Sequence, residues 1–304
     1  MHRCRTYPAS LRWDLALRIG QVASRTETKA VATTILIAFL QSPPAARAVT
    51  WPIERQYIDE NPELQHGSED ALTSWTDPLI GISFVHVPAG CFNMGNNSTA
   101  TYAGDVCVDG FFLSQYEITN AQFRRFRATH DSGGHLGHTL NDDDQPVVRV
   151  NWQDAVAFAA WLSEEIGTQI RLATEAEWEY ACRYGRNGES AEKVSGYGNL
   201  RESGNEPEYE ATVAVGSYEA GLQGAYDMHG NASEWVLDTY VEDADRYGDN
   251  RENPRIEIET TTLRVRRGGS WSSSKTQSSC DVRDYYLGEL AVPHTGFRLV
   301  AKPT

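Results

Sequence analysis

Basic residues, long apolar runs and cysteines are all scarce in this sequence. Among 304 residues, 27 Lys and Arg stand against 42 Asp and Glu, which gives a formal net charge of −15. A protein that binds nucleic acid gains affinity by neutralising phosphates, so a nucleic-acid partner is not expected. The most apolar segment, Ala30–Leu40, is shorter than the roughly 20 residues that cross a bilayer.

The N-terminal region is organised like an export signal. Basic residues precede the apolar segment, a Pro-containing breaker follows it, and Ala46-Arg47-Ala48 has the small-x-small pattern that signal peptidase accepts. We predict a signal peptide over residues 1–48, cleaved after Ala48, and a periplasmic or secreted location. An uncleaved anchor is the alternative. The chain left after cleavage carries 20 basic and 40 acidic side chains, and we expect no stable membrane span in it.

Four of the five cysteines remain after such cleavage, because Cys4 leaves with the signal. An even number of cysteines in an oxidising compartment favours disulfides. Cys91 and Cys107 flank one short loop and are natural partners, which leaves Cys182 with Cys280. The alternative is four reduced, buried thiols.

The patterns that predict helices lie in the front half of the chain. Capping-box patterns at Thr119–Gln122 and Thr174–Glu177 predict two helix starts, the first helix running to Arg127. Apolar residues at helical spacing predict another helix over Trp152–Ile166. Short strands are expected over Gly81–Pro88 and Asp109–Leu113.

Turn signals rich in Gly, Asn, Asp and Pro replace helical periodicity after Arg183. Short strands are expected there over Ala211–Tyr218, Trp235–Tyr240, Leu263–Arg267 and Gly296–Ala301. A few helices followed by a loop-rich region do not suit a parallel α/β sheet and predict an α+β fold. We expect a polar lead-in over residues 49–76 and one domain over residues 77–304.

Five sequence blocks, in order, carry a family resemblance. They are FVHVPAGCFNMG (Phe84–Gly95), RLATEAEWEYACR (Arg171–Arg183), GAYDMHGNASEW (Gly224–Trp235), RVRRGGSWSSSKTQSSCDVR (Arg264–Arg283) and GFRLV (Gly296–Val300). Together they resemble the formylglycine-generating enzyme, or sulfatase-modifying factor, superfamily. The resemblance implies a loop-rich variant of the C-type-lectin-like fold. It also agrees with a bridge between Cys182 and Cys280.

The resemblance further implies a copper site for which this chain has the wrong residues. Oxidase members carry two cysteines after the RGGS turn, which bind copper(I) and activate oxygen. Counted from Ser270, those positions fall at about Ser273 and Ser278. A hydroxyl is a hard, feebly acidic ligand that cannot replace a thiolate for copper(I), so we expect no copper. A serine nucleophile would need a base, for which His229 and His294 are the candidates.

Calcium is the cofactor that the resemblance implies instead. The family's site matches the side chains of Asp227 and Glu234 and the carbonyls of Gly230 and Ala232, which supply the oxygen donors that calcium prefers. A turn held only by hydrogen bonds is the alternative. A second, doubtful site would use Asn199, Leu200, Glu208 and Tyr209, because Pro207 stands where the family has an acid.

A loop rich in His and Asp offers a different metal hypothesis. His130, His135 and His138 precede Asp142–Asp144 at a spacing compatible with a metal. The glycines and acids of the same loop equally describe a solvated segment.

Aromatic and guanidinium side chains are the candidates for gripping a peptide or an aromatic ligand. We expect them to line a groove, and they are Trp235, Arg267, Trp271, Arg283, Tyr285 and Tyr286. The alternative is that Trp235 and Trp271 are core residues and that Arg267 is a structural ion-pair donor.

Two functions remain after these considerations. The first is a calcium-stabilised binding or regulatory module for a periplasmic protein or peptide, similar to family members that assist type VI secretion. The alternative is a cysteine-independent tailoring oxidoreductase that acts on a peptidic small-molecule precursor, similar to the member that matures the pyoverdine chromophore. Formylglycine synthesis ranks third.

Overall fold

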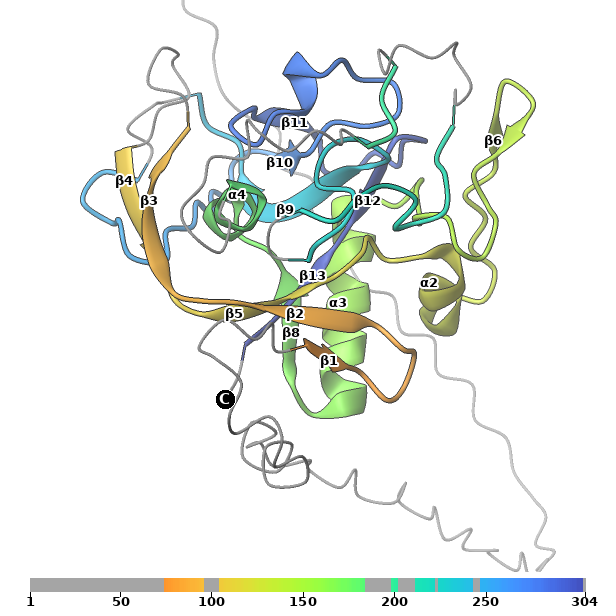
Figure 1. Cartoon of the computed structure of the whole chain (residues 1–304), viewed down its shortest axis with the longest axis horizontal. Coiled ribbons are helices and arrows are strands. Elements are labelled where there is room, and N and C mark those ends of the chain that lie inside the picture. The colour runs from red at the N-terminus through yellow and green to blue at the C-terminus, as the bar shows by residue number, and fades with distance from the viewer. Residues whose placement is uncertain are drawn as a thin grey trace, which may run out of the picture. The chain divides into compact units, whose positions relative to one another are not determined.

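Two β-sheets, each built from strands distant in sequence, organise the chain (Figure 1). The computed structural model describes residues 74–95, 104–183, 198–201, 211–221, 224–242 and 247–302. The first sheet has the order β1 (Ser74–Thr76), β2 (Ser83–Val87), β5 (Phe111–Ser114), β13 (Leu299–Lys302) and β8 (Gln169–Leu172), with every pair antiparallel. The second has the order β11 (Asp284–Leu287), β10 (Leu263–Arg267), β9 (Ser233–Thr239) and β12 (Thr295–Phe297). Only the β9–β12 pair is parallel within that sheet.

Two hairpins and four helical segments complete the described elements. The hairpins are β3 (Gly90–Met94) with β4 (Gly104–Val108), and β6 (Gly134–His135) with β7 (His138–Thr139). The helices are α2 (Asn120–Phe126), α3 (Trp152–Ile166), α4 (Glu175–Arg183) and the short 3₁₀ helix η3 (Thr276–Ser278). The predicted α+β class is confirmed. No helix among the described residues is long and apolar enough to cross a membrane.

Helix α3 forms for the reasons that its sequence gives. Asn151 caps its first turn through a capping box with Asp154, and Gly167 ends it in the left-handed conformation. Its apolar face is buried, and Phe158 stacks on Phe123 of α2 with ring centroids 5.4 Å apart. This face joins the core on one side of the first sheet. The predicted bounds, Trp152–Ile166, are confirmed.

Helix α4 is buried by a different route. Its residues from Glu175 to Cys182 are all buried, although three of them are glutamates. Each glutamate meets an arginine: Glu175 pairs with Arg283, Glu177 with Arg171, and Glu179 with Arg267. The helix packs against the β3–β4 hairpin and against β9 and β10, so these ion pairs lie between layers of the fold.

Three details differ from the sequence-based predictions. Residues 211–218 form turns rather than a strand. The strand expected over Gly296–Ala301 is divided at Arg298 into β12 and β13, which belong to different sheets, because the Arg298 side chain turns inward to Glu234. Strand β1 extends the first sheet to Ser74, so the domain begins before the predicted start at Asp77. The predicted signal peptide, including Cys4 and the cleavage site, lies outside the described residues.

Both predicted disulfides are present. Cys91 and Cys107 are directly opposite each other in the β3–β4 ladder, and Cys182 of α4 is bonded to Cys280 beyond η3. The second bridge joins residues separated by 98 positions, so it fastens the C-terminal loop to the front of the domain.

Candidate functional site

The loop that follows β10 begins with a tight double-glycine turn. Gly268 and Gly269 have φ angles of +88° and +67°, where residues with a side chain are disfavoured. A Cβ atom on Gly269 would lie 2.1 Å from Ser278 Oγ, so the turn requires glycine for close packing as well as for its dihedral angles. The turn therefore fixes Ser278 against the start of the loop.

The serines in the two oxidase positions are used by the loop itself. Ser273 Oγ accepts a hydrogen bond from the Ser270 backbone nitrogen at 3.0 Å. Ser278 Oγ is buried and has no hydrogen-bond partner among the described residues. These positions hold two hydroxyls with different surroundings rather than a matched pair of ligands.

Neither candidate base is hydrogen-bonded to these hydroxyls. His229 Nδ1 lies 2.8 Å from the backbone carbonyl of Ser278, and its Nε2 faces the Cys182–Cys280 sulfurs. His294 Nε2 lies 3.2 Å from Arg266 Nη1. Burial, reinforced by the Arg266 charge, lowers the pKa of His294 to about 4, so this imidazole is neutral at neutral pH. Neither His229 nor His294 is therefore paired with the hydroxyl of Ser278, and the serine hydroxyl that does lie near an imidazole is Ser132 Oγ, 3.2 Å from His130 Nε2 in another loop.

Three of the predicted groove residues lie inside the protein. Trp235 is buried in the core and its Nε1 donates to the Val150 carbonyl at 3.0 Å. Arg267 is buried between glutamates and donates to the carbonyls of Cys280 and Val282. Arg283 is buried against Glu175. A surface groove cannot use these side chains, so the structural alternative holds for Trp235 and Arg267, and Arg283 shares it. It also holds for Trp271, which is buried with 7% of its surface exposed.

The other three predicted residues are not gathered in one place either. Tyr285 is exposed and stacks on Tyr240, with ring centroids 3.9 Å apart. Tyr286, next to it on β11, lies under Arg266, whose guanidinium carbon is 4.8 Å from the ring centroid. Successive residues of a strand point to opposite faces, which separates the two tyrosines.

Trp271 and Tyr286 belong to a chain of contacts that we call the Trp271 cluster, made of Trp271, His135, His294, Arg266 and Tyr286. The rings of Trp271 and His135 have centroids 4.9 Å apart, and His135 acts electrostatically on His294, which contacts Arg266. Trp271 Nε1 and Arg266 Nε are both buried without a hydrogen-bond partner among the described residues. Leaving a buried N–H donor without a hydrogen bond costs about 1–3 kcal/mol of free energy. A ligand that brings a hydrogen-bond acceptor to these donors would recover part of that cost.

Sequence reasoning missed three members of this cluster. His135 was considered only as a metal ligand, His294 only as a base, and Arg266 not at all. The alternation of Arg264 and Arg266 along β10 was the available signal, since it places both on one face of the sheet. The contact with the distant β6–β7 hairpin had no signal in the sequence.

The predicted calcium turn has a tight conformation. Asp227, Gly230 and Asn231 all have positive φ angles, and the Gly230 nitrogen donates to the Gly268 carbonyl at 2.9 Å. This bond ties the calcium turn to the double-glycine turn. The Trp271 backbone nitrogen connects the same two turns a second time, because it donates to the Asn231 carbonyl at 2.9 Å.

Buried acids surround this turn. Glu234 receives Arg298 on both oxygens and the Trp178 indole on one of them. Glu117 accepts from the Asn231 side chain and the Ala232 nitrogen. Asp227 uses Oδ2 to accept from the Gly216 nitrogen, and its buried Oδ1 has no partner among the described residues.

One arginine is set against three carboxylates in this group. Burial, followed by the neighbouring acids, raises the pKa of Glu117 well above its ordinary value. Burial also raises the pKa of Asp227 to about 6. The excess of buried acid and the unpartnered Asp227 oxygen are features that a bound cation would relieve.

The residues of the second predicted calcium site and of the His- and Asp-rich loop lie in different surroundings. Asn199 is buried and its side chain donates to the Ala211 carbonyl at 2.6 Å, while Glu208 and Tyr209 lie outside the described residues. His130 Nε2 lies within hydrogen-bond distance of the Val148 carbonyl, and His135 and His138 face each other in the β6–β7 hairpin. Within the described part of the chain, one group of His, Cys, Asp or Glu brings three ligand atoms within 4.8 Å of one another, and it is Cys182, His229 and Cys280.

Known proteins match this chain over nearly all of the described domain. Residues 79–303 match the sulfatase-modifying factor enzyme 1-like domain. The formylglycine-generating enzyme of Thermomonospora curvata is 32% identical over 297 residues, covering 74% of this chain and 95% of that relative. The formylglycine-generating enzyme of Mus musculus is 26% identical over 298 residues, covering 76% and 78%.

A solved structure has a similar fold. PvdO from Pseudomonas aeruginosa is 25% identical, with a TM-score of 0.65, and the match covers 78% of this chain and all of PvdO. The chain belongs to the sulfatase-modifying factor enzyme 1-like family, with serines in the positions at which the sequence comparison placed the oxidase cysteines.

Proposed function

We propose that this chain is an exported, calcium-stabilised binding module that recognises a protein or peptide partner in the periplasm or outside the cell. The observation that carries the proposal is the Trp271 cluster, with its two buried, unpartnered N–H donors. The hydrogen bond that Ser273 Oγ accepts from the loop backbone, and the contact of His229 with the Ser278 carbonyl rather than with its hydroxyl, support binding over catalysis.

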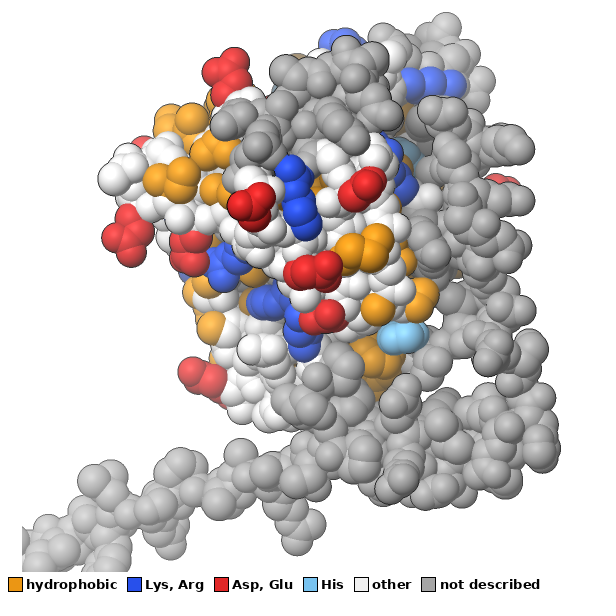
Figure 2. Space-filling model, turned by 90° about the vertical axis from the view of Figure 1, so that its left-hand side faces the viewer, with side chains coloured by type: hydrophobic (Ala, Val, Ile, Leu, Met, Phe, Trp, Pro, Cys, Tyr) orange, Lys and Arg blue, Asp and Glu red, His pale blue; other side chains and the backbone are white. Residues whose placement is uncertain are grey.

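The chemistry of the Trp271 cluster defines the ligand class. The partly exposed ring of Tyr286 suits an apolar or aromatic side chain, and the unpaired donors of Trp271 and Arg266 suit a carbonyl or carboxylate. A peptide offers both in one chain. Figure 2 shows one face of the molecule, on which acidic and basic side chains are interspersed among apolar ones.

Selection of displayed peptides on the oxidised, calcium-loaded chain tests this proposal. Peptides that bind should lose at least about tenfold in affinity for Trp271→Phe, which keeps an aromatic ring and removes the indole N–H. Trp161→Phe on α3 is the matched control and should bind like the parent. Equal affinity for all three proteins would contradict the proposed site.

A tailoring oxidoreductase for a peptidic precursor is the second candidate. The likeness to PvdO across that protein's whole length favours it. Mass spectrometry of exported small molecules from a deletion strain and its parent separates the two functions. Accumulation of a precursor that differs by one oxidation step would support the enzyme, and matching profiles would remove it.

Calcium completes the proposal. Asp227 and Glu234 would contribute side-chain oxygens, and Gly230 and Ala232 would contribute carbonyls. The unpartnered Asp227 Oδ1 and the excess of buried acid fit a hard cation, which would stabilise a turn that has no strand or helix to hold it.

A further inference from the structure

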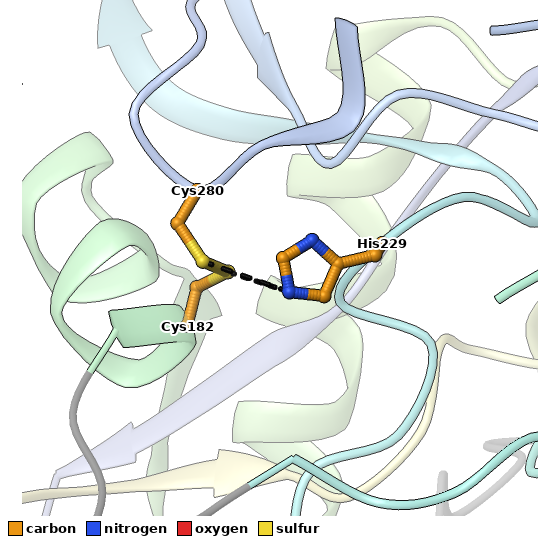
Figure 3. A group of neighbouring side chains, drawn as sticks. All are labelled: Cys182, His229 and Cys280. Carbon is orange, nitrogen blue, oxygen red and sulfur yellow. Dashed lines mark hydrogen bonds between the residues drawn. A yellow bond between two sulfur atoms is a disulfide. The ribbon is translucent and has the colours of Figure 1, made fainter. Parts of the chain in front are cut away.

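Three segments far apart in sequence bring two sulfurs and an imidazole together (Figure 3). Cys182 lies at the end of α4, Cys280 follows η3, and His229 lies in the turn before β9. His229 Nε2 is 3.8 Å from Cys182 Sγ and 3.7 Å from Cys280 Sγ. Both cysteines are buried, so the group is part of the interior rather than a chance surface contact.

The imidazole is held in the orientation of a metal ligand. The Ser278 carbonyl, 2.8 Å from His229 Nδ1, can only accept a hydrogen bond, which assigns the proton to Nδ1. Nε2 therefore presents its lone pair to the sulfurs. Histidines that bind metals usually donate their other N–H to a carbonyl or carboxylate in this way.

The distances also suit a tetrahedral metal. With Zn–S near 2.3 Å and Zn–N near 2.0–2.1 Å, tetrahedral angles place each sulfur about 3.6 Å from the nitrogen and the two sulfurs about 3.8 Å apart. The nitrogen–sulfur distances of 3.7 and 3.8 Å already match. After the disulfide is broken, only the sulfurs have to separate, which rotation of the cysteine side chains allows.

We propose that the Cys182–Cys280 disulfide masks a site for a thiophilic metal such as zinc. A dithiol reductant transfers two electrons and two protons to the bridge, which yields two cysteine thiols and leaves the reductant as a disulfide. Binding of one divalent ion then displaces both thiol protons and engages Cys182, Cys280 and His229. The fourth coordination position is open among the described residues. His229 stands between Asp227 and Gly230 of the proposed calcium turn, but it would contribute an imidazole nitrogen to a thiophilic ion, whereas the calcium proposal uses oxygen donors only. The proposed site shares no ligand with the calcium proposal or with the peptide site.

Cobalt(II), a spectroscopic stand-in for zinc, tests the site directly. The full chain with Cys4, Cys91 and Cys107 replaced by serine is reduced under argon and titrated with cobalt. We expect one cobalt per chain, with the thiolate charge-transfer and intense visible bands of tetrahedral coordination, and no such bands before reduction. His229→Gln should weaken binding at least about tenfold, while His138→Gln on the exposed hairpin should not.

Near-ultraviolet circular dichroism shows whether the reduced, metal-loaded chain keeps its native packing. The proposal requires that the reduced, metal-loaded chain has the spectrum of the oxidised protein. Absence of cobalt bands after reduction, equal affinity of the parent and His229→Gln, or binding only to a chain that has lost its native spectrum would each overturn it.

Discussion

Helices α3 and α4 both pack into the interior of the domain, but they bury different kinds of side chain. Helix α3 buries one apolar stripe and leaves its other face to solvent, while α4 is buried on every side and carries three glutamates into the interior. The burial of α3 removes apolar surface from water, whereas the buried glutamates of α4 are paired with arginines of other segments, Arg171 before the helix and Arg267 and Arg283 after it. The N-terminal half of this domain is stabilised by apolar packing, whereas the C-terminal half is attached to it by ion pairs and a disulfide.

Removing the long disulfide should have the largest effect on this arrangement. Cys182→Ser with Cys280→Ser opens a loop of 98 residues, for which chain entropy predicts a loss of about 4–5 kcal/mol in the free energy of unfolding. Cys91→Ser with Cys107→Ser opens a separation of 16 and should cost about 3 kcal/mol. Urea denaturation measures both. Equal losses would show that the long bridge is not the fastening element.

Breaking the arginine contact of α4 should rank next. Arg267→Ala leaves Glu179 buried without its main partner and should cost about 3–4 kcal/mol. Arg267→Met combined with Glu179→Gln removes both charges, so we expect it to recover about half of that loss. Phe158→Ala in α3 is the comparison from the apolar region, with an expected cost of about 3 kcal/mol and no rescue by removing a charge. A loss below about 1 kcal/mol for Arg267→Ala would contradict the charge-fastened description.

Calcium removal should have an intermediate effect confined to the back of the domain. At a calcium concentration 100 times the dissociation constant, binding stabilises the native state by about 2.7 kcal/mol. Thermal melting with and without a chelator should show this shift in the parent and lose most of it in Asp227→Asn. Asp249→Asn, an exposed control, should respond like the parent. A chelator shift that survives in Asp227→Asn would place the ion elsewhere.

Protonation of Asp238 should be visible as a pH dependence of the free energy of unfolding. Burial, reinforced by Glu175, raises the pKa of Asp238 to about 7, above its unfolded value of 3.8. The folded state thus holds a proton that the unfolded state releases, and stability falls as pH rises from about 4 to about 7. Asp238→Asn should flatten this slope in denaturation measured across that range. An unchanged slope would assign the effect to another buried acid.

Much of the front of the fold could be predicted because local patterns there agree with the tertiary structure. The capping boxes of α2 and α3 and the apolar stripe of α3 each depend on residues within a turn or two of one another. The strand over Leu263–Arg267 was predicted to the residue. The turns at 211–218 were not predicted, because alternating apolar residues alone do not supply a neighbouring strand for pairing.

For the proposed binding site, the sequence predicted which types of residue to expect but not which of them are buried. Trp235, Trp271 and Arg267 were indistinguishable from surface ligands in the sequence, and all three are buried in the structure. An arginine in a strand carries no mark of whether distant glutamates will meet it. The Trp271 cluster itself depends on the β6–β7 hairpin and β10, which no local pattern connects.

The sequence by itself determined the family, both disulfide pairings and the start points of the helices, and it predicts hydroxyls in place of two sulfur ligands. These properties follow from residue identity and short-range spacing. Only the tertiary structure decided which arginines are interior, where unpaired donors gather, and that His229 faces the Cys182–Cys280 bridge. The physical reason is that burial and ion pairing are long-range properties, set when segments separated by 50 to 100 residues pack together.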